Sequence, residues 1–230
     1  MNRTRISPAI VSYGLYLYFS SRSFRLAAKC LSSYILKRSH VAIWKWVQKY
    51  SDCADRFLRT DKRLVRVIFV DETLLQIDGQ DYWLWVAYEP YLSSCLMMHL
   101  SKERTIFVCY QFFKQLRCRY GRRPIFTDGA QWYNDACRWL RLEHYMYGTK
   151  LKNLMERFIQ HIKDRTECFD DHFPCRKKEN CDRQHLWNWL KLFVLYLHRE
   201  WTGCYSWRSW QGMEVKLTGH NNIVVFLFSF

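Results

Sequence analysis

The first 51 residues of the chain contain no aspartate and no glutamate, but they contain nine lysines or arginines. Such a segment has no acidic residues to offset its positive charge. A role as a mere cap on a larger core would not explain this charge. The whole chain is also basic, with a formal net charge of +15 and a pI near 9.5. This field attracts polyanions, of which nucleic acid is the most common. Ribosomal, membrane-surface and heparin-like partners stay open at this point.

The sequence also lacks a long hydrophobic run. The most apolar stretch near the start, residues 8–19, is too short to span a bilayer and is interrupted by Ser12, Gly14 and tyrosines. No small-residue cleavage site follows it, so we expect no secretory signal. These absences predict a cytoplasmic protein without membrane association.

The ten cysteines form no C-x-x-C pair, and most of them are expected to be free thiols in the core. One cluster stands apart, and its members are Cys168, His172, Cys175, Cys181 and His185. It could supply four zinc ligands, but its spacing matches no standard zinc finger. We therefore expect no structural zinc and favour an ordinary proline-containing loop, or a Cys175–Cys181 bridge if the source is a hyperthermophile.

The acid-free segment does contain helical periodicity. Residues 8–19, 23–34 and 39–50 each place apolar residues at helical spacing, and Ser39 suits the N-cap of the third helix. Two helices joined by a short polar turn predict a helix-turn-helix whose second helix enters a major groove. At least one of the tryptophans 44 and 46 is expected in the core, and residues 1 to about 60 are expected to fold alone. The residues expected to contact DNA here are Arg38, Ser39, His40, Trp44, Lys45 and Lys49.

A second pattern follows residues 52–64, which mix charges without apolar periodicity and are expected to form a linker. Three strands, with Asp78-Gly79 as a strong hairpin signal, precede a helix, a strand, a helix, a strand and a helix. This order predicts an α/β domain with a mixed central sheet. An apolar helix over 183–200 is expected on the back of that sheet or against a second subunit. The tail 201–230 has three glycines and an uncharged β-prone ending, and we expect it to be dispensable.

Three carboxylates occupy related places in this layout. Asp71 ends the first predicted strand, Asp128 ends the fourth, and Glu156 lies on the helix after the fifth. Each alone could be a turn former or a surface residue, but converging carboxylates require a divalent cation between them. Two Mg²⁺ ions could activate a water or a 3′-hydroxyl and stabilise the leaving oxygen of a phosphodiester. The basic residues of the same helix would hold the DNA backbone; they are Lys152, Arg157 and Lys163.

The segments "VDET…DGQDYWLWVAY", "FTDGAQWY" and "KNLMERFIQHIKDRT" resemble the three acidic motifs of DDE transposases of bacterial and archaeal insertion sequences. The resemblance covers about residues 8–200, and in it "RSHVAIWKWVQKY" corresponds to the family's recognition helix. It implies a helix-turn-helix domain at 1–51 and an RNase H-like catalytic domain at 65–200. It further implies Asp71, Asp128 and Glu156 as the catalytic triad, Mg²⁺ or Mn²⁺ as cofactor, and terminal inverted repeats as substrate.

The sequence therefore predicts a transposase that cuts double-stranded DNA at element ends and joins the freed 3′-hydroxyl to a target strand. The first alternative is a catalytically inactive DNA-binding remnant of a transposase. The second is a metal-dependent nuclease without strand transfer. Because transposition holds two ends together, we expect at least a homodimer on DNA.

Overall fold

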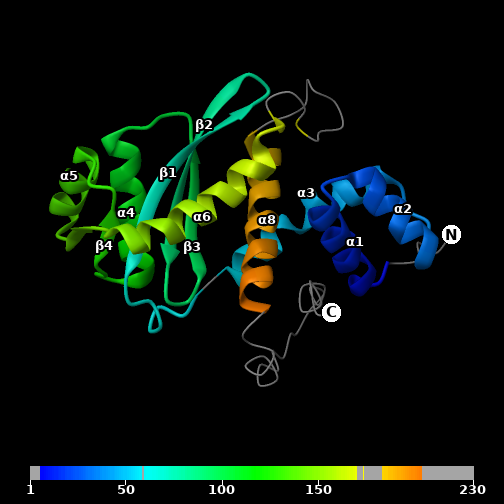
Figure 1. Ribbon diagram of the computed structural model, residues 1–230, viewed down its shortest axis with the longest axis horizontal. Helices are drawn as coiled ribbons and strands as arrows, with labels where there is room; N and C mark the ends of the chain where they lie inside the picture. Colours follow the sequence, from blue (N-terminus) through cyan, green and yellow to red (C-terminus); the bar gives the residue numbers. More distant parts are fainter. Residues whose placement is uncertain (1–5, 59, 170–172, 174–182, 204–230) are drawn as a thin grey trace. The chain divides into compact units, whose positions relative to one another are not determined.

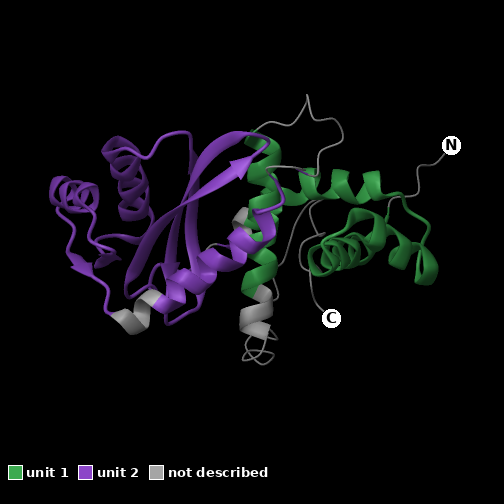
Figure 2. Cartoon of the chain, turned by 45° about the horizontal axis from the view of Figure 1, so that its top comes forward, with its two compact units in different colours: residues 1–57, 175–230 green, residues 58–174 purple. Residues whose placement is uncertain are grey.

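The computed structural model describes residues 6–58, 60–169, 173 and 183–203 of the chain. Packing divides the chain into two compact units, which Figure 2 colours separately. Unit 1 comprises residues 1–57 and 175–230, and unit 2 comprises residues 58–174. Among the described residues, no helix has the length and apolar character that a bilayer span requires. The tail from residue 204 onward lies outside the described residues, as do His172, Cys175 and Cys181.

The described part of unit 1 is helical (Figure 1). Its elements are α1 (Pro8–Ser21), α2 (Phe24–Tyr34), α3 (His40–Phe57) and α8 (Arg183–Gly203). The hydroxyl of Ser23 accepts the backbone N–H of Leu26, and that of Ser39 accepts the N–H of Ala42. These bonds satisfy N–H groups that have no partner inside α2 and α3. The three N-terminal helices and the Ser39 cap are confirmed.

The first three helices pack against one another around a common apolar core. Leu15 of α1, Leu31 of α2 and both Ile43 and Val47 of α3 are completely buried. Trp46 is also buried, which confirms that one of the two neighbouring tryptophans belongs to the core. Helical spacing therefore identified the buried faces correctly.

Helix α3 continues to Phe57 and so includes the first six residues of the predicted linker. Ser51 and Ala54 are buried and extend the face that Val47 begins. Their spacing is helical, but serine and alanine give little hydrophobic signal. The linker expectation for residues 52–57 is therefore wrong, because small buried residues carry the periodicity there.

Helix α8 packs against α3 and α1. The indole N–H of Trp189 donates to the hydroxyl of Tyr18 at 2.8 Å, and the Lys191 ammonium lies 2.8 Å from a carboxylate oxygen of Asp52. The expected apolar stripe is buried; its members are Leu186, Leu190, Phe193 and Leu197. The helix was expected on the back of the sheet or against a second subunit, and not against α3 and α1. Helix α8 supplies part of the same core, and the expectation that residues 1 to about 60 fold alone stays a prediction.

Unit 2 contains a five-stranded sheet in the order β3-β2-β1-β4-β5. The strands are β1 (Ile68–Ile77), β2 (Gln80–Glu89), β3 (Ser94–Ser101), β4 (Ile125–Thr127) and β5 (His144–Met146). The first three pair antiparallel, whereas β4 and β5 run parallel to β1. The helices are α4 (Ile106–Tyr120), α5 (Gln131–Leu140) and α6 (Thr149–Thr166). This mixed sheet with flanking helices is the RNase H-like arrangement that was expected.

The β1–β2 hairpin turns at Asp78 and Gly79, whose φ angles are 54° and 69°. Two consecutive positive φ angles match the twist of the flanking strands, and Asp-Gly is a preferred pair for them. The turn sets the register in which Ile77 faces Gln80. The hairpin predicted from Asp78-Gly79 is confirmed.

Helices cover both faces of the sheet (Figure 1). Ile68 and Val70 of β1 belong to an apolar cluster with side chains of α4 and α5. On the other face, Tyr88 of β2 contacts Phe158 of α6, with ring centroids 5.1 Å apart. Since Tyr88 pairs with Phe69, the odd-numbered residues of β1 face α6. Asp71 therefore lies on the α6 face of the sheet.

Candidate active site

Asp71 lies inside β1 and not at its end, so the expectation of a strand terminus there is wrong. The strand continues because its second half pairs with β2 in the hairpin. Pairing with β4 stops earlier, at Phe69 opposite Phe126. In this parallel register, Asp71 lies level with Asp128, which follows β4. The two aspartates therefore lie side by side where the two strands separate.

A tight turn holds Asp128. Its Oδ1 accepts the N–H of Ala130 at 3.1 Å, just before α5, so the residue also has the turn-forming role that its sequence context allowed. Gly129 has a φ of 91°, and a Cβ there would lie 2.9 Å from the methyl carbon of Met146. Thr127 Oγ1 accepts the Gly129 N–H at 3.1 Å and lies 2.7 Å from His144 Nε2. The turn is thus fixed from β5 and leaves the Asp128 side chain exposed.

Helix α6 brings the third carboxylate. It packs against β1 and buries Met155, Phe158 and Ile162. Glu156 and its neighbour Arg157 are exposed, as is Lys163, about two turns after Glu156 along the helix. The Lys152 side chain lies outside the described part. Helical geometry therefore separates an apolar side, which anchors α6, from a charged side that carries Glu156.

The three carboxylates share one electrostatic environment. Burial, the neighbouring Glu72 charge and smaller contributions from Asp128 and Glu156 together raise the pKa of Asp71 to about 7. The backbone N–H of Glu72 donates to Asp71 Oδ1 at 2.9 Å and opposes the increase. The unfavourable negative charge that we expected at this edge of the sheet is therefore present.

The donor chemistry of this site fits a hard divalent cation. Carboxylate oxygens are the ligands that Mg²⁺ takes, and a cation would relieve the repulsion that raises the Asp71 pKa. Within the described ranges, no three His, Cys, Asp or Glu side chains are grouped closely enough to hold one metal ion. The carboxylates thus interact through space without forming a closed coordination shell.

Two further features at this site were missed from the sequence. Glu72 points to the other face of β1, where its side chain is 1% exposed and accepts a hydrogen bond from Arg104 Nε at 2.6 Å. The Arg104 guanidinium lies over two indole rings, 4.7 Å from the centroid of Trp83 and 4.5 Å from that of Trp132. Arg104 thus compensates a buried charge directly next to Asp71. Because its partners come from three elements, no local pattern indicated it.

The second missed residue is Tyr147, which follows β5. Its N–H donates to the carbonyl of Thr127 at 3.2 Å and its hydroxyl donates to that of Val70 at 3.4 Å. Burial raises the pKa of this phenol above its usual value, and Asp71 and the other nearby carboxylates raise it further. The residue therefore stays a neutral hydrogen-bond donor beside the acidic cluster.

The raised pKa of Asp71 predicts that this residue destabilises the metal-free protein. The folded state binds the proton more tightly than the unfolded state, so stability falls as the pH rises from about 4 to about 7. A shift of this size corresponds to about 4 kcal/mol at most, and screening by salt reduces it, so Asp71→Asn should stabilise by about 2–3 kcal/mol at pH 8. Urea unfolding in EDTA measures this gain. It should vanish near pH 4, and equal stability of both proteins at pH 8 would contradict the prediction.

Unit 1 presents several of the residues expected to contact DNA. His40, Lys45 and Lys49 of α3 are exposed, and the last two lie one turn apart on the same side of the helix. Arg38 is half-buried, and the exposed Ser39 caps α3. Trp44 is half-buried, with its ring 5.5 Å from that of His185 in α8.

The seven described cysteines, including Cys168, are free thiols, and three of them are buried.

The fold and the interacting acids define an RNase H-like domain of the polynucleotidyl transferase class. Within that class, residues 65–185, more than half of the chain, match the family model of the DDE domain of IS240 transposases. The chain therefore belongs to the DDE transposase family. This assignment confirms the resemblance of the three acidic motifs. The N-terminal helices lie outside the matched residues.

Three relatives illustrate the similarity. The uncharacterized protein MJ0017 of Methanocaldococcus jannaschii is 28% identical over 196 residues, which cover 85% of this chain and 87% of that protein. The magnesium-bound integrase catalytic core of HTLV-2 is 19% identical with a TM-score of 0.40, over 56% of this chain and 86% of that one. The integrase catalytic core of BIV is 17% identical with a TM-score of 0.39, over 60% and 98% respectively.

Proposed function

We propose that the protein is a transposase that cleaves DNA at the ends of its element and joins the freed 3′-hydroxyl to a target strand. The observation that carries this proposal is the electrostatic effect of Asp128 and Glu156 on the buried Asp71 inside a DDE domain. These residues come from β1, the β4–α5 turn and α6, and only the tertiary fold relates them. Asp128 and Glu156 make ionisation of Asp71 less favourable, and a bound divalent cation would offset this cost.

We assign the role of holding divalent cations, two Mg²⁺ or Mn²⁺ ions, to the same three carboxylates. Such cations would activate the attacking oxygen and stabilise the leaving oxygen of a phosphodiester. Asp71 is held in position by its hydrogen bond from the Glu72 N–H, and Asp128 by the turn before α5. The Tyr147 hydroxyl donates to the Val70 carbonyl beside them and so helps to fix the backbone just before Asp71. Arg157 and Lys163, which are exposed on α6, would hold the adjacent backbone, as would Lys152.

We assign DNA end recognition to unit 1, with α2 and α3 as a helix-turn-helix. The exposed His40, Lys45 and Lys49 lie on α3, the helix expected in the major groove. Their approach to DNA is favoured by the basic charge of the segment before Asp52. Transposition requires two ends in one complex, so the acting form is proposed to be a homodimer on DNA.

The test is incubation of the full chain with a duplex that carries the ends of its own element, with Mg²⁺, Mn²⁺ or EDTA. We expect cleaved and joined products with either metal and neither product in EDTA. Binding without any cleavage would identify an inactive DNA-binding remnant of a transposase. Cleavage without joining would identify a nuclease, and absence of binding would overturn the proposal.

A further inference from the structure

A basic pocket lies where α2 ends and α3 begins, within unit 1. It has a volume of about 470 Å³. The pocket is lined by three cationic and three hydroxyl side chains; they are Lys29, Lys37, Arg38, Ser32, Ser33 and Ser39. Such a lining offers positive charge and hydrogen-bond donors without a single carboxylate. Its chemistry is complementary to phosphate oxygens.

The backbone around this pocket is fixed independently of the cationic groups. The N–H of Arg38 donates to Ser32 Oγ at 3.1 Å, and Ser32 Oγ lies 3.3 Å from the Arg38 carbonyl oxygen, to which it donates. This pair joins α2 to the loop before α3. The Ser39 hydroxyl then caps α3 at the N–H of Ala42. The backbone of Arg38, and not its charged end, therefore joins this loop to α2.

The cations of the pocket have no counter-charge among the residues that the structure describes. In the part of the chain that the structure describes, no carboxylate pairs with Lys29, Lys37 or Arg38. Arg38 donates from one terminal nitrogen to the carbonyl of Lys37 at 3.2 Å, whereas its Nε is shielded from water without a hydrogen-bond partner. Because no carboxylate of the described residues offsets these three charges, they are available to an external polyanion.

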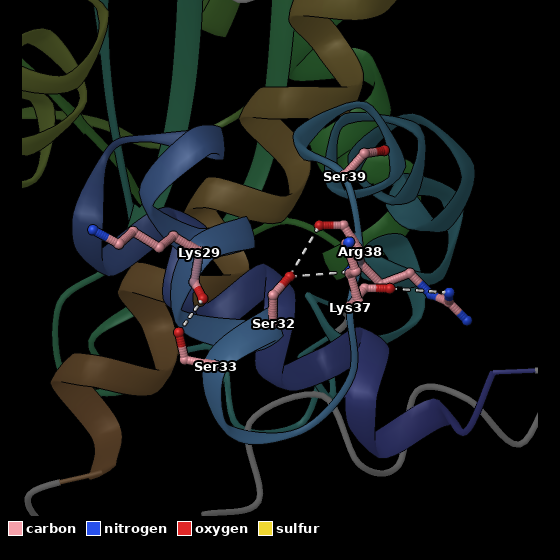
Figure 3. Close-up of a pocket in the computed structure, with 6 residues that line it drawn as sticks. All are labelled: Lys29, Ser32, Ser33, Lys37, Arg38 and Ser39. Carbon is pink, nitrogen blue, oxygen red and sulfur yellow. Dashed lines mark hydrogen bonds between the residues drawn. The ribbon is translucent and has the colours of Figure 1, made fainter.

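The arrangement of the side chains indicates an extended ligand. Figure 3 shows Lys29 and Arg38 reaching to opposite sides of Ser32. Side chains that point to opposite sides suit the successive phosphates of a nucleic-acid strand. The pocket also lies directly before α3, the helix proposed to enter the major groove, where backbone contacts would set its register.

We propose that this pocket binds the sugar–phosphate backbone of double-stranded DNA, with Lys29 and Arg38 holding different phosphates. The assignment rests on the proposed DNA binding by unit 1. It adds Lys29 and Lys37 to the residues expected to contact DNA, and it assigns the contact of Arg38 to the backbone. Backbone contacts carry no sequence information, so the pocket strengthens binding to every duplex equally.

The experiment measures binding of the full chain to two labelled duplexes in EDTA, one with an element end and one of unrelated sequence. Lys29→Ala and Arg38→Ala should each weaken binding to both duplexes by about five- to tenfold. The double variant should reduce the slope of log affinity against log salt by about 2. The matched control is Lys114→Ala with Arg122→Ala, which removes two exposed cations beside the opposite face of the sheet from Asp71 and should change neither quantity.

Each outcome decides the assignment. Weakening confined to the element-end duplex would indicate base contacts, and an unchanged salt slope would show that the pocket is not used. Either result would overturn the proposed role of the pocket, although the chain would still bind DNA. Competition by sodium phosphate at matched ionic strength would show a site for the free ion and overturn the DNA assignment. Failure of the unmodified chain to bind either duplex would overturn both the pocket and the proposed function. Circular dichroism should show unchanged helicity, since the backbone of residue 38 and not its side chain fixes the loop.

Discussion

Replacing Asp71 or Asp128 by asparagine, or Glu156 by glutamine, is expected to reduce cleavage of element ends by at least about a thousandfold. An amide has nearly the same shape as a carboxylate, but it is neutral and cannot compensate a divalent cation. DNA affinity in EDTA should change little, because the proposed contacts of unit 1 do not involve these residues. Gel assays of cleavage and of binding, made on the same variants, separate the two effects.

Two matched substitutions serve as controls. Asp164→Asn removes an exposed carboxylate from the same helix as Glu156, where it accepts a hydrogen bond from the Gln160 side chain at 2.6 Å. Glu143→Gln removes another exposed carboxylate, which lies just before β5. Both variants should remain active. Activity that survives in Glu156→Gln but is lost in one of these controls would move the third ligand to that residue.

Arg104→Ala is expected to lower the free energy of unfolding by about 3–5 kcal/mol, because it leaves the buried charge of Glu72 unpaired. One oxygen of Glu72 already lacks a partner among the described residues, so the other depends on Arg104. Burial raises the pKa of Glu72 despite the arginine. Loss of the guanidinium also removes its contacts with two indole rings.

A double-mutant cycle identifies the cause. Glu72→Gln in the Arg104→Ala background should recover most of the lost stability, because it removes the buried charge that had become unpaired. The control is Arg138→Ala, which breaks an exposed pair with Asp135 and should cost less than about 1 kcal/mol. Urea unfolding measures the wild type, both single variants, the double variant and the control. Equal costs for Arg104→Ala and Arg138→Ala would contradict a buried, compensating role for Arg104.

Helical periodicity predicted that α8 is buried, but it did not predict which helices α8 packs against. The stripe from Leu186 to Leu197 predicted that this helix must be buried, and it is. The choice of partner depended on polar contacts over long sequence separations, such as Trp189 with Tyr18 and Lys191 with Asp52. A stripe of leucines fits many apolar surfaces equally well. Its amphipathic pattern therefore could not identify α3 and α1 as partners.

Local chemistry determined most of the elements of unit 2 in advance. β-Branched and apolar-rich runs predicted the strands, and Asp78-Gly79 predicted the hairpin because few other pairs adopt two positive φ angles. The order of elements then predicted a mixed sheet, and the DDE family match confirmed the resemblance of the acidic motifs. These features depend on neighbours in the chain, which a sequence displays directly.

Only the tertiary structure decided the environment of the acids. The parallel register of β1 and β4 places Asp71 level with Asp128, and burial beside Glu72 raises the Asp71 pKa. The Arg104 contacts with Glu72, Trp83 and Trp132 join residues from separate elements. The sequence by itself determined which residues could hold a cation and bind DNA. Their electrostatic coupling depends on distances and solvent exclusion, which arise only when distant segments pack together.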